Sequence, residues 1–175
     1  NKLSLDHQPK NYLIISSDIE SRYETVITKV SEFLDRSVEK ILENPDVMYV
    51  SLPVIDKSGN IISTLSNYEL QMREYGLLDK LDANRIGNEI TIDQIREVIS
   101  FTQISAHNNK KIVILNSASN MNKEASSALL KTLEEVSSNC TFILLASSLN
   151  NIAETIKSRC QILLLEGNLE MKRNS

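Results

Sequence analysis

The chain has 175 residues, of which 41% are hydrophobic and 24% charged, and its formal net charge is −4. Such a composition is typical of one globular domain and disfavours a disordered or coiled-coil protein. A free-standing nucleic-acid-binding protein usually carries a basic excess, which this acidic chain lacks.

The cysteines and the termini indicate a reducing environment without a membrane. Cys140 and Cys160 lack metal-site spacing and are too few for a disulfide framework, so we expect a cytoplasmic protein with no bound metal. Residues 1–10 are polar, unlike a signal peptide, and the apolar runs are too short to cross a bilayer. The chain does not begin with Met and residues 166–175 are polar, as in a fragment of a longer protein.

The first part of the chain predicts two strands and a helix. The apolar run Tyr12–Ile15 is typical of a buried strand. Ser17 and Glu20 have the spacing of a capping box, and apolar residues at helical spacing then predict a helix to about residue 35. Residues 47–55 predict a second strand.

The pattern weakens after this strand. Pro53 marks the edge or the end of the strand, because proline cannot donate a backbone hydrogen bond. Residues 58–60 (Ser-Gly-Asn) form a turn signal that predicts a hairpin, and a helical patch follows around residues 68–81.

Three more strands are predicted at residues 112–115, Cys140–Ala146 and 161–165. Helices that begin at Thr91 and near residue 120, and a helical turn at residues 151–157, precede them. Thr91 forms a capping box with Gln94. The two helices have apolar faces at helical spacing: Ile92, Ile95, Ile99 and Thr102, and then Ala125, Ala128, Leu129, Thr132, Leu133 and Val136.

The alternation of strands and helices predicts the fold class. Strands without polar alternation, separated by helices, indicate a parallel sheet that is covered on both faces. We therefore expect a three-layer α/β domain, a parallel five-stranded sheet with helices on both faces. Residues 1–165 would form this core, and residues 166–175 would be a tail or the start of a further region.

The turn after the first strand is where such a fold would bind phosphate. A phosphate-binding loop needs glycines, whose backbone amides close around the phosphate, and a lysine at the helix start. This turn instead contains Ser16, Ser17, Asp18 and Glu20, and the four glycines of the chain lie elsewhere. Because the two carboxylates would repel a polyphosphate, we expect a plain capped helix and no nucleotide or other cofactor.

The end of the third strand leads to the same conclusion. Nucleotide hydrolases of this class place acidic residues there to hold magnesium. This strand runs into Asn116 and Ser117, which carry no charge. Two independent losses predict that the chain has no ATPase activity of its own.

Several sequence blocks occur in residues 89–165 in a specific order: TIDQIREVI, MNKEA, SALLKTLEE, FILL and TIKSRCQ. In these blocks the chain resembles the clamp-loader branch of the AAA+ proteins, and within it the delta-prime subunits of bacterial DNA polymerase III. The Ser-Arg-Cys triplet is the signature of that branch. Residues 1–50 match weakly, and residues 56–87 match no family segment, which implies an insertion.

The resemblance implies an AAA+ core, similar to that of the P-loop NTPases, in a non-hydrolysing subunit of a five-membered clamp-loading ring that serves DNA replication. Its partners would be gamma- or tau-like motor subunits and a delta-like clamp-opening subunit. Primed DNA and the sliding clamp would be reached through the assembly. The zinc-binding cysteines, the helical lid and the collar domain of the family have no counterpart in these residues.

The same resemblance assigns a role to Arg159. In the family, the arginine of the Ser-Arg-Cys motif reaches the ATP of the neighbouring motor subunit as an arginine finger in trans. A guanidinium suits this role because it is always charged and its planar fork matches phosphate oxygens. Ser158 and Cys160 would complete the interface by shaping the turn and filling the core, without reacting chemically.

Other functions are less well supported by the sequence. The main alternative is a gamma- or tau-like motor subunit with a degenerate ATP site. A different enzyme would need groups that converge, whereas His7 and His107 lie in polar segments without a nearby nucleophile or acid. A receiver-type signalling domain would need an acid where Asn116 stands.

Overall fold

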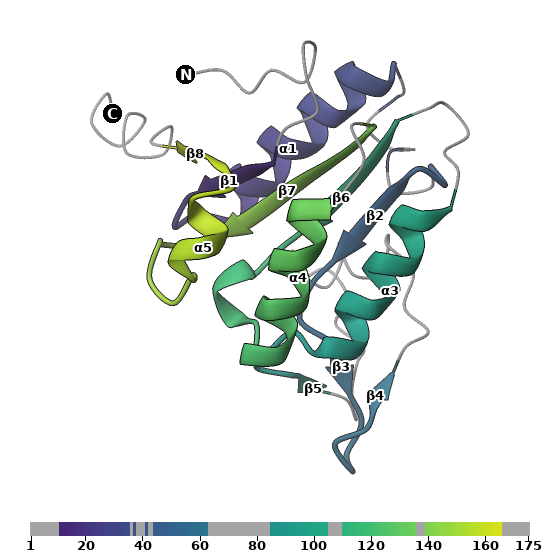
Figure 1. Cartoon of the computed structure of the whole chain (residues 1–175), viewed down its shortest axis with the longest axis vertical. Coiled ribbons are helices and arrows are strands. Elements are labelled where there is room, and N and C mark those ends of the chain that lie inside the picture. The colour runs from purple at the N-terminus through teal and green to yellow at the C-terminus, as the bar shows by residue number, and fades with distance from the viewer. Residues whose placement is uncertain are drawn as a thin grey trace.

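A computed structural model describes residues 11–35, 37, 41, 44–62, 85–104, 110–135 and 139–165 of the chain. At its centre lies a five-stranded sheet in the order β2-β6-β7-β1-β8, and every neighbouring pair is parallel (Figure 1). The strands are β1 (Tyr12–Ile15), β2 (Val47–Val50), β6 (Lys111–Leu115), β7 (Cys140–Ala146) and β8 (Gln161–Leu164). The predicted parallel five-stranded sheet is confirmed.

Helices cover both faces of this sheet, as the sequence predicts. They are α1 (Ile19–Leu34), α3 (Ile92–Gln103), α4 (Lys123–Glu135) and α5 (Glu154–Lys157). On one face, α3, α4 and α5 pack on a buried cluster that includes Leu13 and Ile15 of β1. On the other face, α1 packs on a cluster that includes Tyr12 and Ile14 (Figure 1). Successive residues of β1 thus enter two different cores, which is why the strand shows no polar alternation.

Side-chain caps set where two of the helices begin. The Thr91 hydroxyl accepts a hydrogen bond from the Gln94 amide at 3.4 Å, and the Gln94 side chain accepts one from the Thr91 amide at 3.1 Å, so the predicted capping box is confirmed. Asn122 caps α4, because its Oδ1 accepts from the Ala125 amide at 2.8 Å. The capping box predicted for Ser17 and Glu20 involves the Glu20 side chain, which lies outside the described residues, so it stays a prediction; in the same turn the Ser16 hydroxyl accepts a hydrogen bond from the Asp18 amide.

The segment predicted as one strand at residues 47–55 is two strands in two sheets. β2 ends at Val50, and β3 (Val54–Ile55) pairs in antiparallel fashion with β4 (Ile61–Ile62) and β5 (Arg85–Ile86). Proline has no amide hydrogen with which to extend the first ladder. The Pro53 carbonyl instead accepts a hydrogen bond from the Gly87 amide at 2.7 Å and so joins the second sheet.

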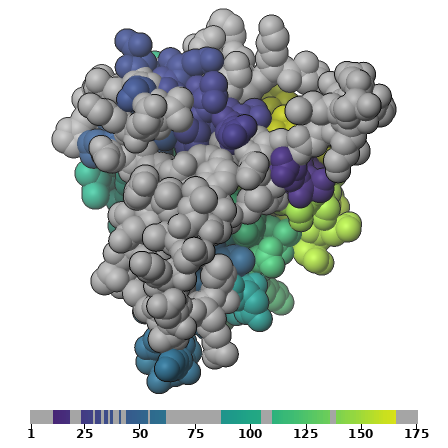
Figure 2. All heavy atoms as spheres, turned by 180° about the vertical axis from the view of Figure 1, so that it is seen from behind, coloured from purple at the N-terminus to yellow at the C-terminus, as the bar shows by residue number. Residues whose placement is uncertain are grey.

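The hairpin predicted at residues 58–60 is confirmed between β3 and β4. Gly59 adopts a left-handed φ of 87°, which glycine tolerates without strain. The Asp56 carboxylate accepts hydrogen bonds from the Ser58 and Asn60 amides at 2.9 and 2.8 Å. The amide of Asn60 is the main reason that the pKa of Asp56 lies below its usual value. Figure 2 shows this hairpin at the lower tip of the molecule, remote from α1.

Several predictions concern residues outside those that the structure describes. They are the helical patch at 68–81, most of the insertion at 56–87, the tail 166–175, the side chain of Glu20, and residues His7, His107 and Val136. Within the described ranges, every helix falls short of the length and apolar character that a membrane crossing requires.

Burial predicts which side chain anchors α4 to the sheet. Leu129 is fully buried beneath this helix, so Leu129→Ala leaves a cavity and should lower the free energy of unfolding by about 2–5 kcal/mol. Ser127→Ala on the exposed side of α4 should change that free energy by less than about 0.5 kcal/mol. Urea unfolding followed by circular dichroism measures both values. Equal values for the two variants would contradict the packing described.

Candidate functional site

The connection between β1 and α1 is short, and polar groups in it form hydrogen bonds within the chain. It consists of three residues, Ser16, Ser17 and Asp18, and none of them is glycine. Ser16 is buried, its amide donates to the Ala146 carbonyl at 3.0 Å, and its hydroxyl accepts from the Asp18 amide at 3.2 Å. The Asp18 amide is therefore bound within the chain. In a phosphate-binding loop, amides at this place face the ligand instead.

The end of β6 is occupied by a structural hydrogen-bond network. Asn116 is buried, and its Nδ2 donates to the Tyr49 hydroxyl at 3.3 Å. Its Oδ1 accepts from the Ser117 amide at 2.9 Å, while Ser117 itself has left-handed backbone angles. These contacts hold the turn after β6 against β2. At the position where an acidic side chain would bind magnesium, the chain thus has a neutral amide with partners inside the protein.

Arg159 lies in the turn between α5 and β8, where its neighbours fix its position. The Ser158 hydroxyl donates to the Thr155 carbonyl at 2.9 Å, which closes the turn after α5. Arg159 Nη1 donates to the same hydroxyl at 3.3 Å and, over 3.5 Å, to the same carbonyl. Its Nη2 forms an ion pair with Glu134 Oε1 of α4 at 2.6 Å. The side chain is 41% exposed, so a partner protein can reach the guanidinium.

The two predicted parts of the site lie at opposite ends of the sheet. β1 and β8 run parallel, and Ile15 at the end of β1 lies opposite Leu164 at the end of β8. The turn 16–18 follows β1 and so lies at the carboxyl end of the strands. Arg159 precedes β8 and lies at their amino end. Four extended residues span roughly 13 Å, which separates the arginine from the turn of its own chain.

The thiol of Cys160 belongs to the packing of the domain. Cys160 is partly buried and packs against the same cluster as α4 and α5. Burial raises its pKa to about 11, and burial raises the pKa of Cys140 to about 12, although the charge of Lys111 opposes the latter shift. Both thiols are free and protonated near neutral pH. That Cys160 fills space and does not react stays a prediction, which its packing and the raised pKa support.

Glu134 contacts Arg159 and is not among the residues predicted for the site. A signal was available, because Glu134 and Glu135 end α4, where the partial negative charge of the helix disfavours further negative charge. The last turn of α4 contains no basic residue that could compensate. Such an unfavourable placement favours a partner outside the helix, which Glu134 has in Arg159.

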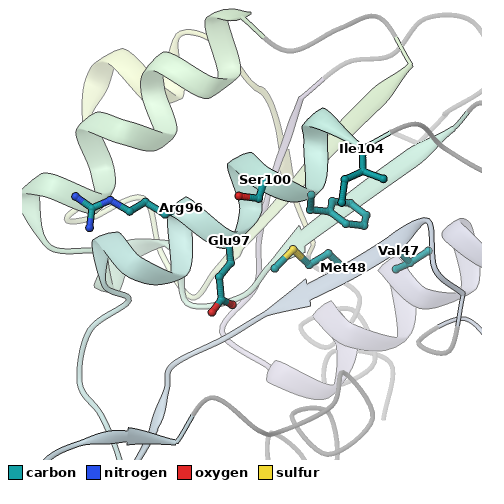
Figure 3. Close-up of a pocket in the computed structure, with 7 residues that line it drawn as sticks. Val47, Met48, Arg96, Glu97, Ser100 and Ile104 are labelled. Atoms are coloured by element: carbon teal, nitrogen blue, oxygen red, sulfur yellow. The ribbon is translucent and has the colours of Figure 1, made fainter.

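A separate hollow of about 520 Å³ lies between α3 and β2 (Figure 3). Met48, Phe101 and Ile104 give it an apolar lining, and Ile104 is 65% exposed. Arg96 stands at its rim, points away from these apolar side chains and pairs with Asp93 at 2.9 Å. The residues predicted for the site lie elsewhere. In the described part of the chain, no three His, Cys, Asp or Glu side chains are grouped as metal ligands.

The family model described as DNA polymerase III, delta subunit, matches residues 66–168, which is more than half of the chain. DNA polymerase III subunit delta' of Haemophilus influenzae is 39% identical over 77 residues, which cover 43% of this chain and 24% of that protein. Replication factor C subunit 5 of Neurospora crassa is 31% identical over 137 residues, which cover 77% of this chain and 36% of that protein. The chain thus spans between about a quarter and a third of these relatives' lengths.

A solved structure shares the fold. A DNA polymerase III, gamma subunit-related protein of Thermotoga maritima superposes with a TM-score of 0.59 at 19% identity, over 96% of this chain and 45% of that one. This likeness confirms the expected α/β class and says nothing by itself about activity.

The raised thiol pKa values predict low reactivity. At pH 8, three units below a pKa of about 11, roughly one Cys160 in a thousand is a thiolate, so both cysteines should react with iodoacetamide far more slowly than free cysteine. Burial favours the neutral thiols, so their contribution to stability is complete below the unfolded pKa of about 8.5 and is lost as pH rises toward 11 and 12. Mass spectrometry measures the labelling, with the urea-unfolded chain as control. Rapid labelling of Cys160 in the folded chain would contradict the packing assigned to it.

Proposed function

Because the chain belongs to the DNA polymerase III, delta subunit, family, we propose that it is a non-hydrolysing, delta-prime-like subunit of a clamp loader and supplies Arg159 in trans to a neighbouring ATPase. In this role it serves DNA replication in the cytoplasm. It assembles with gamma- or tau-like motor subunits and a delta-like clamp-opening subunit, and it meets primed DNA and the sliding clamp through that assembly. In this proposal residues 1–165 are its core domain, with an insertion at about 56–87 that overlaps the family match from residue 66 on, and residues 166–175 are a tail or the start of a further region.

The placement of Arg159 is the observation that carries this proposal. The arginine precedes β8 at the amino end of the sheet, whereas the turn 16–18 lies at the carboxyl end. A finger at this place cannot serve a nucleotide in its own chain. It can serve a nucleotide that a neighbouring subunit presents to the α5–β8 edge. The separation therefore supports action in trans.

The chemistry of the side chain supports the same role. Charge on the oxygens of a transferring γ-phosphoryl group is stabilised by a planar guanidinium that offers two parallel donors. Arg159 is partly exposed and stands on a turn that Ser158 closes. A short, internally bonded turn holds the guanidinium near one location, and such positioning is how protein groups accelerate phosphoryl transfer.

The absence of hydrolysis in this chain is supported by the turn after β1 and by the end of β6. Three residues without glycine connect β1 to α1, and Asp18 brings a carboxylate to the place where phosphate would lie. Asn116 uses its amide within the protein. A motor subunit with a degenerate ATP site remains the alternative, and nucleotide binding separates the two.

Removal of Arg159 should slow the ATPase of the neighbouring subunit. In a clamp loader reconstituted from the full-length protein and its cognate subunits, Arg159→Ala should lower kcat of the motor subunit's ATPase by about a thousandfold or more, because an arginine finger contributes that much in other phosphoryl-transfer proteins. Arg159→Lys should recover little, since an ammonium lacks the planar fork. Steady-state phosphate release measures both rates.

Arg96→Ala is the matched control for this experiment. Arg96 is also an exposed arginine in an ion pair with a carboxylate of the chain, but it stands on α3 and not on the α5–β8 turn (Figure 3). The ATPase should stay within about twofold of wild type, because exposed ion pairs contribute little. Normal ATPase in the Arg159→Ala assembly would overturn the finger role.

This chain alone should not bind ATP with micromolar affinity. Titration of the purified full-length protein with fluorescent ATP and Mg²⁺ should give no saturable binding in the micromolar range, because the turn 16–18 offers neither a glycine-rich cradle nor a lysine. A bona fide motor subunit from the same organism serves as the positive control. Micromolar affinity or measurable turnover would favour the alternative, a motor subunit.

A further inference from the structure

The guanidinium of Arg159 is held by a second element of the fold. Its Nη2 lies 2.6 Å from Oε1 of Glu134, which stands in the last turn of α4. This contact spans two elements, α4 and the α5–β8 turn, that are separated in sequence by the whole of β7. The Thr155 carbonyl and the Ser158 hydroxyl accept from Nη1. Two elements therefore fix one guanidinium.

The surroundings of Glu134 reinforce its hold on a cation. α4 ends in two consecutive carboxylates, Glu134 and Glu135, and its last turn has no basic residue. The carboxyl end of a helix also carries about half a negative charge. Negative charge is thus concentrated where it does not stabilise the helix. A cation supplied from outside α4 offsets that cost, and Arg159 is the cation that lies there.

The contacts of Arg159 still leave donors for a ligand. A guanidinium has five N–H groups in a fixed plane. Among the described residues, its partners bind through Nη1 and Nη2, and the Nε–H has no partner. Glu134 can therefore keep its ion pair with Nη2 while other N–H groups of the guanidinium stay available for a phosphate of a neighbouring subunit.

We propose that Glu134 is a positioning residue for Arg159, an inference that rests on the proposed function of Arg159 as a finger in trans. The carboxylate holds the guanidinium in place before the neighbouring subunit docks. A free arginine side chain at the surface would be ordered only on engagement, and ordering a side chain of this kind costs about 0.5–1.5 kcal/mol. With Glu134 present, part of that cost is already met when the isolated subunit folds.

If the Glu134–Arg159 contact were inhibitory, its removal would change the ATPase rate in the opposite direction. If Glu134 withheld Arg159 from the neighbour's phosphate, removing its charge would raise the ATPase rate. An exposed ion pair is weak, and a triphosphate with its magnesium presents more negative charge than one carboxylate. The ion pair with Glu134 therefore does little to prevent Arg159 from binding the phosphate of the neighbouring subunit. The geometry therefore favours positioning over inhibition, and the sign of the rate change separates the two.

The test is Glu134→Gln in the reconstituted clamp loader built from full-length subunits. The substitution keeps the shape of the side chain and removes its charge. We expect kcat of the motor ATPase to fall about two- to tenfold, because that is the factor that corresponds to the free energy of ordering one such side chain. KM for ATP should stay within about twofold of wild type. A purely structural defect would instead reduce assembly, which gel filtration of the complex measures.

Glu135→Gln is the matched control. It removes the same charge from the same helix end, and the structure shows no contact between Glu135 and Arg159 among the described residues. Its kcat should match wild type. Loss of rate in Glu135→Gln equal to that in Glu134→Gln would assign the effect to the charge of the helix end and would overturn the inference.

The double variant Glu134→Gln with Arg159→Ala tests whether Glu134 acts through the arginine. Its ATPase should equal that of Arg159→Ala alone, because the two residues then form one unit. An unchanged or raised kcat in Glu134→Gln, or a double variant slower than Arg159→Ala, would overturn the positioning role and leave the finger role intact. An Arg159→Ala assembly with normal ATPase would overturn the proposed function and this inference together.

Discussion

The common direction of the five strands is the constraint on which the rest of the structure depends. β1 and β8 are hydrogen-bonded in parallel register, so their carboxyl ends lie together and their amino ends lie together. The segment that follows β1 and the segment that precedes β8 therefore lie at opposite ends of the sheet. Helices then cover both faces, since parallel strands of this kind are apolar on both sides. The turn 16–18 and Arg159 inherit their separation from this backbone arrangement. No side-chain contact is needed to explain it.

Much of this arrangement could be predicted from sequence because its causes are local. The apolar run at β7 and the capping box at Thr91 each depend on residues close together in the chain, and both appear in the structure. The break after Val50 could not be predicted in full, because Pro53 permits either an edge strand or a strand end. What decides between them is the hydrogen bond from Gly87, a residue 34 positions away.

The candidate site likewise has a part that could be predicted from the sequence and a part that could not. Missing glycines and a missing acid are visible in the sequence itself, and the turn after β1 and the end of β6 have contacts that fit those absences. The role proposed for Arg159 rests on a resemblance to a family, since an arginine before a strand has no special periodicity or spacing. Its contact with Glu134 could not be predicted, because the contact depends on how α4 and α5 lie over the sheet. Only the unfavourable charge at the end of α4 hinted at a partner.

The junction between Pro53 and Gly87 has a consequence for how this chain can diverge. A methyl group at position 87 would lie 3.0 Å from the Pro53 ring, tighter than ordinary van der Waals contact. The hydrogen bond between Gly87 and Pro53 adjoins the β3–β5 pair, and among the described strands the small antiparallel sheet shares no ladder with the five-stranded sheet. A side chain at position 87 would therefore crowd Pro53 and strain the β3–β5 pair, whereas the ladders of the five-stranded sheet involve neither residue. A change at this junction therefore acts on the small sheet beyond the carboxyl end of β2, away from the amino end of β8 at which Arg159 lies.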